Sequence, residues 1–168
     1  MSELKRTQLY EIHVAAGASM VDFGGWEMPV QYPTGIVAEH LYTRHFCSLF
    51  DVSHMGEVLF TGPTALDTLN HLLTNDYNGM PVNKVRYSAM CNEKGGTIDD
   101  LVVYKFGEES YLAVVNAANR EKDFAHMAKN VLPGTTATFC SMARFTKSSM
   151  RIFSGRVIHM NRPPSGRV

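Results

Sequence analysis

The spacing of apolar residues along the chain predicts four helices. The clearest one opens at Gly62-Pro63, where proline suits a first helical turn because its missing N–H would have no partner there. Its apolar positions recur at helical spacing, at Ala65, Leu66, Leu69, Leu72 and Leu73. Three weaker helices are predicted over residues 7–16 (Thr7 as N-cap, Gly17 as stop), over residues 35–47, and from Asn116 to about Lys129.

Shorter apolar segments between these helices predict strands over residues 57–61, 85–91, 97–105 and 111–115. Residues 92–96, which include two glycines, form the expected hairpin loop. Residues 22–35 are rich in glycine, proline and aromatic side chains, and we expect a structured loop there. The order helix, helix, strand, helix, three strands, helix favours the α+β class, an antiparallel sheet with flanking helices.

Charge divides the chain at about residue 130. The 168 residues are 45% hydrophobic, enough for a core, and carry a net charge of +0. Residues 1–130 hold 16 acidic and 10 basic side chains, whereas residues 131–168 hold six basic ones and no acidic one. The second segment also lacks clear periodicity. We therefore predict a folded domain over 1–130 and an irregular or disordered basic tail over 131–168.

The remaining composition excludes several classes of protein. The cysteines, Cys47, Cys91 and Cys140, form no C-x-x-C pair, and their odd number argues against a disulfide framework. The seven histidines show no H-x-x-x-H spacing for a metal. The charged start of the sequence is followed by no apolar segment, so we expect no signal peptide there. The chain has no run of 18 apolar residues, and its net charge suggests neither nucleic acid nor a membrane as partner. We expect a soluble, cytoplasmic protein.

Two pairs of polar residues are candidates for chemistry. Asp99-Asp100 lies within an otherwise apolar strand, and neighbouring strand residues point to opposite faces, so the two carboxylates cannot serve one site. A carboxylate in such surroundings needs a hydrogen bond or a partner. The pair is therefore either functional or a turn-flanking feature of the hairpin. Asn116 and Asn119 are likewise either helix-capping residues or amides that bind a heteroaromatic ligand at a strand-to-helix corner.

Two other segments are better explained as scaffold. Asp51, Ser53 and His54 are the residue types of a hydrolase triad, but triad members normally lie far apart in sequence, and a G-x-S-x-G motif is missing. We expect that segment to be a loop between a helix and a strand. Gly24-Gly25 can form a turn or let the backbone approach a ligand, and Trp26 is expected to belong to the core or scaffold.

Five segments, taken together and in order, resemble the aminomethyltransferase of the glycine cleavage system, the T-protein family. Each segment alone is moderately specific, and all five in order are highly specific. They are Phe23 to Tyr32 (FGGWEMPVQY), Leu49 to Glu57 (LFDVSHMGE), Leu73 to Asp76 (LTND), Tyr87 to Tyr104 (YSAMCNEKGGTIDDLVVY) and Val114 to Asp123 (VVNAANREKD).

The resemblance implies a reaction, a partner and a site. A lipoylated carrier, the H-protein, presents an aminomethyl group, whose methylene is transferred to tetrahydrofolate with release of ammonia and without a metal. The resemblance implies that Asp100 is catalytic: it orients the folate and stabilises positive charge on the reacting carbon as the carbon–sulfur bond breaks. It also implies that Tyr87, Asn116 and Met55 lie around the folate, and that the fold is most of the first domain of a three-domain protein.

The resemblance stops near residues 129–134, where the family continues with an acidic, strand-rich segment and a Leu-Gln-Gly-Pro motif. The abrupt change in both match and charge points to an out-of-frame or misassembled end. The alternative is a genuine basic tail for nucleic acid or another partner, which the lack of interleaved aromatic residues disfavours.

Three functions remain open at this point. The chain is an aminomethyltransferase, a folate-binding module without transferase activity, or a non-enzymatic fragment that interacts through its basic tail. The intact Trp26, Asp100 and SHMGE segment favour the first. Because the family's pterin-clamping acid and carboxylate-binding arginine lie beyond the matched part, we expect this chain to be truncated, poorly stable and inactive.

Overall fold

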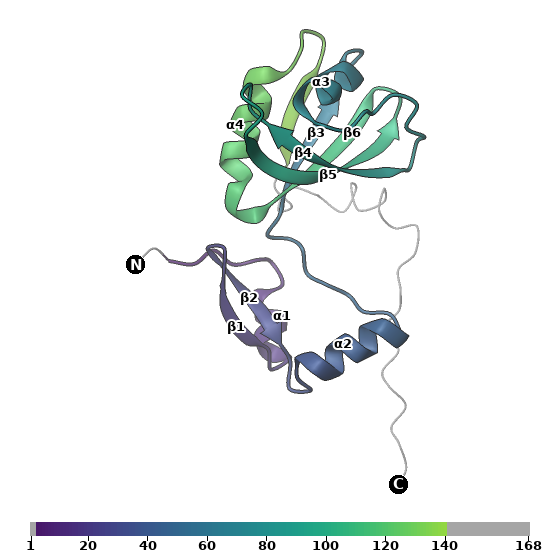
Figure 1. The fold of residues 1–168 in the computed structure, drawn as a ribbon. Helices are drawn as coiled ribbons and strands as arrows, with labels where there is room; N and C mark the ends of the chain where they lie inside the picture. The colour runs from purple at the N-terminus through teal and green to yellow at the C-terminus, as the bar shows by residue number, and fades with distance from the viewer. Residues whose placement is uncertain (1–2, 141–168) are drawn as a thin grey trace.

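The fold is described by a computed structural model over residues 3–140 (Figure 1). A five-stranded sheet with helices α3 and α4 makes one lobe, called here the sheet lobe. Helices α1 and α2 and a two-stranded hairpin make the other, called the N-terminal lobe. The predicted α+β class, an antiparallel sheet with flanking helices, is confirmed.

Five antiparallel strands form the sheet in the order β4-β5-β6-β3-β7. The β4–β5 hairpin loop is held by Asn92, whose Oδ1 accepts the backbone N–H groups of Lys94 and Gly96 at 2.9 Å each. The four predicted strands are all present. The bounds are β3 (Gly56–Thr61), β4 (Val85–Cys91), β5 (Thr97–Gly107), β6 (Ser110–Val115) and β7 (Thr136–Cys140).

Helices α3 (Ala65–Leu72) and α4 (Arg120–Asn130) pack on the same face of this sheet, called here the core face. Strand alternation turns Leu101 and Val103 toward the helices, where both are almost fully buried. Pro63 was expected in the first turn of α3, but it precedes the helix, in a turn closed by the bond from Ala65 N–H to Gly62 O (3.0 Å). The fully buried members of this core include Val58, Phe60, Ala65, Leu69, Tyr77, Met90, Val103, Tyr111, Ala113 and Val115.

The opposite face of the sheet, called here the outer face, carries a row of paired residues across four strands. Tyr87 pairs with Val102, Val102 with Val114, and Val114 with Glu57. Asp100 lies in the next row, opposite Ala89 of β4. Both helices of the lobe pack on the core face, so this row of side chains faces away from them.

Strand β7 corrects the expectation that residues 131–168 are irregular. Thr136–Cys140 pairs antiparallel with β3 and places Ala137 and Phe139 against the core. The preceding Thr135 fixes the segment, since its hydroxyl lies 2.8 Å from those of Thr64 and Thr68 of the α3 region. A strand of five residues is too short for its alternation of apolar and polar side chains to be recognised in the sequence. It forms because the edge of β3 supplies partners for its backbone hydrogen bonds. Residues 141–168, the rest of the predicted tail, lie outside the described part.

The N-terminal lobe contains a hairpin where a loop was predicted over residues 22–35. Strands β1 (Ser19–Phe23) and β2 (Trp26–Gln31) pair antiparallel, joined by Gly24 and Gly25 at φ +60° and +84°. The proline and glycine content of this segment is typical of a loop, so the sequence did not predict the strand pair. Pro29 is tolerated because both strands of a two-stranded ribbon are edge strands, where a missing backbone N–H donor costs little. Helix α2 (Ile36–His45) lies within the predicted 35–47.

Helix α1 (Tyr10–Ala15) is shorter than the predicted 7–16. Gly17 ends it as expected, at φ +77°, with its N–H donating to Val14 O at 2.9 Å. Thr7 is not the N-cap. Its hydroxyl instead donates to Asp51 Oδ2 at 2.8 Å, which ties the chain before α1 to the loop before β3.

Asp51 is the most heavily hydrogen-bonded carboxylate of this lobe. Its Oδ2 accepts from Thr7 and lies 3.0 Å from His13 Nε2, and its Oδ1 accepts from the backbone N–H of Ser53 at 2.9 Å and from its hydroxyl at 2.5 Å. Burial alone would raise the pKa of Asp51, but the bonds from Ser53, His13 and Thr7 outweigh it and lower that pKa to about 2.

We expect Asp51→Asn to destabilise the N-terminal lobe by about 2 kcal/mol at pH 7, because bonds to a charged acceptor are lost. A depressed carboxyl pKa stabilises the fold above the ordinary value of 3.8, and this stabilisation is lost as the pH falls toward about 2. Urea unfolding at pH 7, 4 and 3, followed by the fluorescence of Trp26 in β2, measures both effects. Asp67→Asn, an exposed change in α3, serves as control. Equal stability of Asp51→Asn and the parent at pH 7 would contradict this assignment.

Candidate functional site

Asp100, Tyr87 and Asn116 meet at one end of the outer face. Asp100 is exposed on β5. The residue after it, Leu101, pairs with Val115 of β6, and Asn116 follows directly after Val115, so Asn116 comes beside Asp100. The Tyr87 hydroxyl donates to Asp100 Oδ2, a bond that raises the pKa of Tyr87. The structure therefore brings together three of the four site residues predicted from the sequence.

The Asn116 amide has a single consistent orientation. Its Nδ2 donates to Asp99 Oδ1 at 2.9 Å, to Asp100 O at 3.0 Å and to Asp100 Oδ1 at 3.3 Å. All three partners are acceptors, so the nitrogen faces them and Oδ1 is directed elsewhere. The helix-capping alternative for Asn116 is wrong for its side chain. The 3₁₀ turn after it, Ala117–Asn119, is closed by backbone alone, from Asn119 N–H to Asn116 O at 3.1 Å.

Met55, the fourth predicted residue, lies at the same end of the sheet but farther from Asp100. It precedes Gly56, which pairs with Val115, so β6 separates it from β5. Two strand spacings correspond to about 10 Å. Met55 is half-buried, and its position stands beside the Tyr87–Asp100–Asn116 group rather than within it.

Asp99 points to the core face, as strand alternation requires, and is buried there. Burial would raise the pKa of Asp99, but hydrogen bonds, first from Asp123 and then from Asn116, lower it. Asp123 is the acidic residue that sequence reasoning missed. The signal was present, because Arg120, Asp123 and Met127 follow helical spacing and form the buried stripe of α4.

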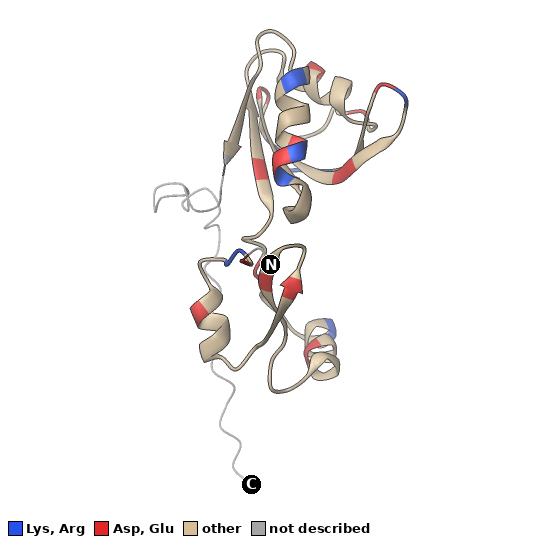
Figure 2. Ribbon diagram, turned by 90° about the vertical axis from the view of Figure 1, so that its left-hand side faces the viewer, with Lys and Arg blue, Asp and Glu red and all other residues tan. Residues whose placement is uncertain are grey.

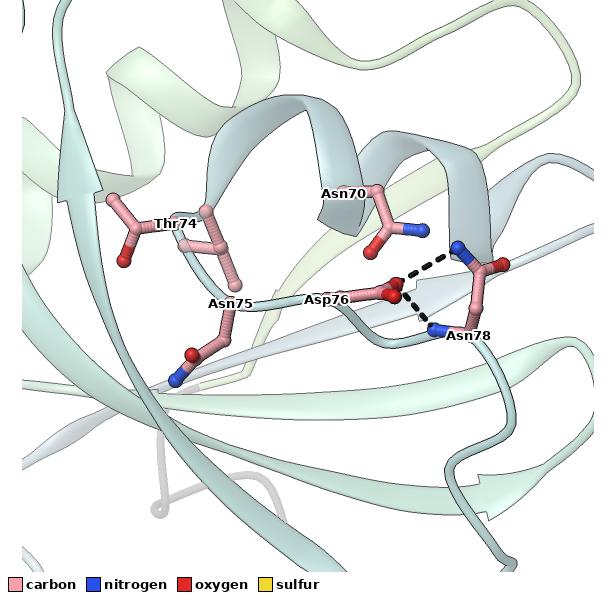
Figure 3. Close-up of a pocket in the computed structure, with 6 residues that line it drawn as sticks. Asn70, Thr74, Asn75, Asp76 and Asn78 are labelled. Atoms are coloured by element: carbon pink, nitrogen blue, oxygen red, sulfur yellow. Dashed lines mark hydrogen bonds between the residues drawn. The ribbon is translucent and has the colours of Figure 1, made fainter.

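The LTND segment after α3 braces β4 from its outer edge. Thr74 N–H donates to Ala89 O at 3.0 Å, and Asn75 N–H donates to Ser88 Oγ at 3.0 Å. A shallow hollow there is lined by Asn70, Leu73, Thr74, Asn75, Asp76 and Asn78 (Figure 3). Its carboxylate, Asp76, is satisfied internally by the backbone N–H and Nδ2 of Asn78, each at 2.8 Å. We interpret the hollow as structural support for the strand that carries Tyr87.

Trp26 belongs to the scaffold between the lobes, as expected. It is 8% exposed, and the Arg120 guanidinium lies 5.4 Å from its ring centre and 5.4 Å from that of Phe139. Arg120 also donates to His54 O at 3.4 Å. Asp51, Ser53 and His54 do not form a triad. The Ser53 hydroxyl donates to Asp51, whose histidine partner is His13, and the buried His54 Nδ1 has no hydrogen-bond partner among the described residues.

Residues 3–140 contain no group of three or more His, Cys, Asp or Glu side chains arranged to hold a metal ion. No helix in that part of the chain has the length and apolar character needed to cross a bilayer.

Comparison with known proteins identifies the family. The family described as GCVT N-terminal domain matches residues 9–152, most of the chain and all five sequence segments quoted above. The chain belongs to this family. It corresponds to the amino-terminal portion of the glycine-cleavage T-protein, an aminomethyltransferase. The match continues past Asp123, where the last of the five segments ends, and the division of the chain at residue 130 stays a prediction.

Individual relatives agree with this assignment. The chain is 54% identical over 134 residues to an aminomethyltransferase of Desulforamulus reducens, covering 80% of this chain and 36% of the relative. It is 50% identical over 138 residues to that of Listeria welshimeri, covering 82% and 38%. The crystal structure of glycine cleavage system aminomethyltransferase T from Bartonella henselae matches with a TM-score of 0.78 at 37% identity, over 82% of this chain and 38% of that one. The chain thus spans little more than a third of the length of its relatives.

Proposed function

We propose that this chain is the folate-facing, amino-terminal part of an aminomethyltransferase. The complete enzyme moves the methylene of a lipoyl-bound aminomethyl group to tetrahydrofolate and releases ammonia. The observation that carries the proposal is the Asp100 carboxylate, held on the outer face by a donor on each side, the Tyr87 hydroxyl on Oδ2 and the Asn116 amide on Oδ1.

The residues of the outer face support a ligand with a flat ring system whose edge bears N–H groups. Val102 and Val114 lie side by side in the row next to Asp100 and form an apolar floor. Asp100 and Asn116 Oδ1, the atom on the other side of the amide from the bonded Nδ2, offer acceptors at the border of this floor. Reduced pterins combine a flat ring system with ring N–H donors, so tetrahydrofolate suits both features. Met55, at the same end of the sheet, completes the proposed folate-binding set.

The chemistry assigned to Asp100 is electrostatic. When the carbon–sulfur bond of the carrier adduct breaks, the sulfur keeps the electron pair and the aminomethyl carbon becomes positively charged. A carboxylate already oriented by Tyr87 and Asn116 stabilises that charge without rearrangement in the transition state. One folate nitrogen then forms a carbon–nitrogen bond to this carbon. Ammonia leaves as a second folate nitrogen bonds to the same carbon, giving 5,10-methylenetetrahydrofolate, and the carrier thiolate takes up a proton and is released as the dihydrolipoyl form. The partner proposed for this step is the lipoylated H-protein.

A chimaera tests the proposal. The 134 matched residues of the Desulforamulus reducens enzyme are replaced by those of this chain. We expect tetrahydrofolate-dependent release of ammonia from aminomethylated carrier within about tenfold of the parent rate, because a factor of ten corresponds to only about 1.4 kcal/mol of barrier. Circular dichroism and gel filtration establish that the chimaera folds.

The outcome separates the two main functions considered. A folded chimaera that binds tetrahydrofolate but releases no ammonia would support the alternative, a folate-binding module without transferase activity. A folded chimaera that neither binds tetrahydrofolate nor releases ammonia would contradict both functions.

A further inference from the structure

A pair of buried carboxyl groups lies directly beneath the Asp100 site, on the core face. Asp123, in the first turn of α4, is 0% exposed, and Asp99 of β5 is 7% exposed. The charged residues of α4 include both signs (Figure 2), but its exposed acid, Glu121, pairs with Lys5 at 3.6 Å. Asp123 is therefore the acid that α4 buries against the sheet.

Apart from the carboxyl group of the other aspartate, three oxygens of this pair meet no hydrogen-bond donor within residues 3–140: both of Asp123, and Oδ2 of Asp99. The nearby ammonium of Lys122 is 3.9 Å from Asp123 Oδ1, and it donates instead to Ile98 O at 2.8 Å. Two adjacent, buried, ionised carboxylates would be strongly unfavourable. A proton on Asp123 removes one of the two negative charges. The resulting carboxylic acid hydroxyl can then donate to Oδ2 of Asp99.

The titration behaviour of the pair agrees with one shared proton. Burial, followed by the hydrogen bond and charge of Asp99, raises the pKa of Asp123 to about 8. The pKa of Asp99 is lowered. The remaining charged groups that act on Asp123 are Lys122 on its own helix, which lowers its pKa, and Asp100 on β5, which raises it. Asp99 is therefore the charged member of the pair at neutral pH and Asp123 the neutral one.

Hydrogen bonds continue from this pair to the outer face. Asp99 uses its other oxygen, Oδ1, to accept from Asn116 Nδ2 at 2.9 Å. The same nitrogen reaches the backbone and side chain of Asp100. Asn116 Nδ2 therefore contacts Asp99 on one side and Asp100 on the other, so a reorientation of the Asp99 carboxylate would be felt at Asn116.

We propose that Asp123 is a positioning residue whose carboxylic acid proton holds Asp99 and, through it, fixes Asn116 with its amide oxygen toward the ligand on the outer face. The assignment of the ligand rests on the proposed function, whereas the proton-dependent orientation of Asn116 does not. Loss of the proton removes the donor and adds a second negative charge, so Asp99 and Asn116 lose their fixed orientation as the pH rises through about 8.

The first experiment needs no ligand. Carboxyl ¹³C and side-chain amide ¹⁵N resonances of the full chain are followed by NMR from pH 6 to pH 9.5. We expect one aspartate carboxyl with a midpoint near 8, and the Asn116 amide signal shifting with the same midpoint. In Asp123→Asn, whose amide keeps a donor without titrating, the Asn116 signal should stay constant. Glu121→Gln, an acid-to-amide change on the exposed side of α4, should titrate as the parent does.

The second experiment measures binding of 5-formyltetrahydrofolate to the full chain by calorimetry. A site that needs the proton of a group with pKa 8 loses affinity about tenfold between pH 7 and pH 9. Asp123→Asn should retain affinity within about twofold across this range, since its donor does not titrate, and Asp123→Ala should bind weakly at both pH values.

The results separate the two proposals. An Asn116 amide signal that ignores pH in the parent chain, or that still titrates in Asp123→Asn, overturns the positioning role whatever the folate result. A parent chain that binds no folate at any pH, while its Asn116 amide follows the carboxyl titration, supports the positioning role and overturns folate binding by this chain. If Asp123→Asn does not fold, the titration of the parent alone decides.

Discussion

Replacing Asp100 by Asn should reduce methylene transfer by at least about 100-fold in the chimaera, the size of effect seen when a preorganised electrostatic group is removed. The substitution keeps the shape of the side chain, and its amide can still meet Tyr87 and Asn116. It removes the full negative charge to which the proposed mechanism assigns stabilisation of the developing cation. Because Asp100 is exposed and makes no core contact, thermal stability should change little.

Tetrahydrofolate-dependent ammonia release under saturating carrier measures the loss, and equilibrium binding of tetrahydrofolate shows whether it lies in binding or in the chemical step. Tyr87→Phe, which keeps the carboxylate and removes one bond to it, should lose only about tenfold. Asp67→Asn on α3 is the matched control. If Asp100→Asn retains more than a tenth of the parent rate, the electrostatic role assigned to this carboxylate is wrong.

The second large effect concerns the turn between β3 and α3. Gly62 has φ +119°, a region that L-residues rarely adopt, and a Cβ there would overlap the carbonyl oxygen of Gly134. Its N–H donates to Glu109 O at 3.1 Å, so the turn cannot shift without losing a contact to the β5–β6 connection. We expect Gly62→Ala to destabilise the sheet lobe by at least about 3 kcal/mol, the sum of backbone strain and overlap.

Chemical unfolding of the full chain, followed by far-ultraviolet circular dichroism, measures this loss. Gly95→Ala provides a control in the same lobe, because Gly95 also has positive φ (+78°) but nothing lies within 4 Å of its Cβ position. It should cost about 1 kcal/mol, from the backbone conformation alone. Similar losses in the two variants would show that the approach of Gly134 to Gly62 is not a tight contact.

The parts that sequence reasoning predicted well are those in which local pattern and tertiary structure agree. Val85–Cys91 is a strand with the predicted bounds, because alternation and a glycine-containing loop act on neighbouring residues. The opposite facing of Asp99 and Asp100 followed from strand geometry alone. The family and the expectation that Asp100, Tyr87 and Asn116 lie together came from the resemblance of five segments, and the structure places those three in contact. Their roles in folate binding and transfer stay predictions.

The parts that were missed depend on partners far away in the sequence. The β1–β2 hairpin was hidden by a composition typical of loops, and β7 became a strand only because β3 had a free edge. The sequence predicts Thr7 as a helix cap, but in the structure its hydroxyl donates to the carboxylate of Asp51, 44 residues away. Asp123 was not among the predicted site residues, and only the packing of α4 on the sheet shows that it is fully buried beside Asp99.

By itself, the sequence determined the α+β class, most of the strands and the family, and it predicts that Asp100 is the carboxylate that faces the proposed ligand. Those conclusions depend on periodicity, turn chemistry and motif order, which are local properties of the chain. Only the tertiary structure decided that Asp123 is buried against Asp99, and that Asn116 joins both to Asp100. Helical spacing marks Asp123 as part of one stripe with Arg120 and Met127, but it does not show which side chain that stripe is buried against. A proton-sharing pair arises only when two elements distant in sequence exclude water between them.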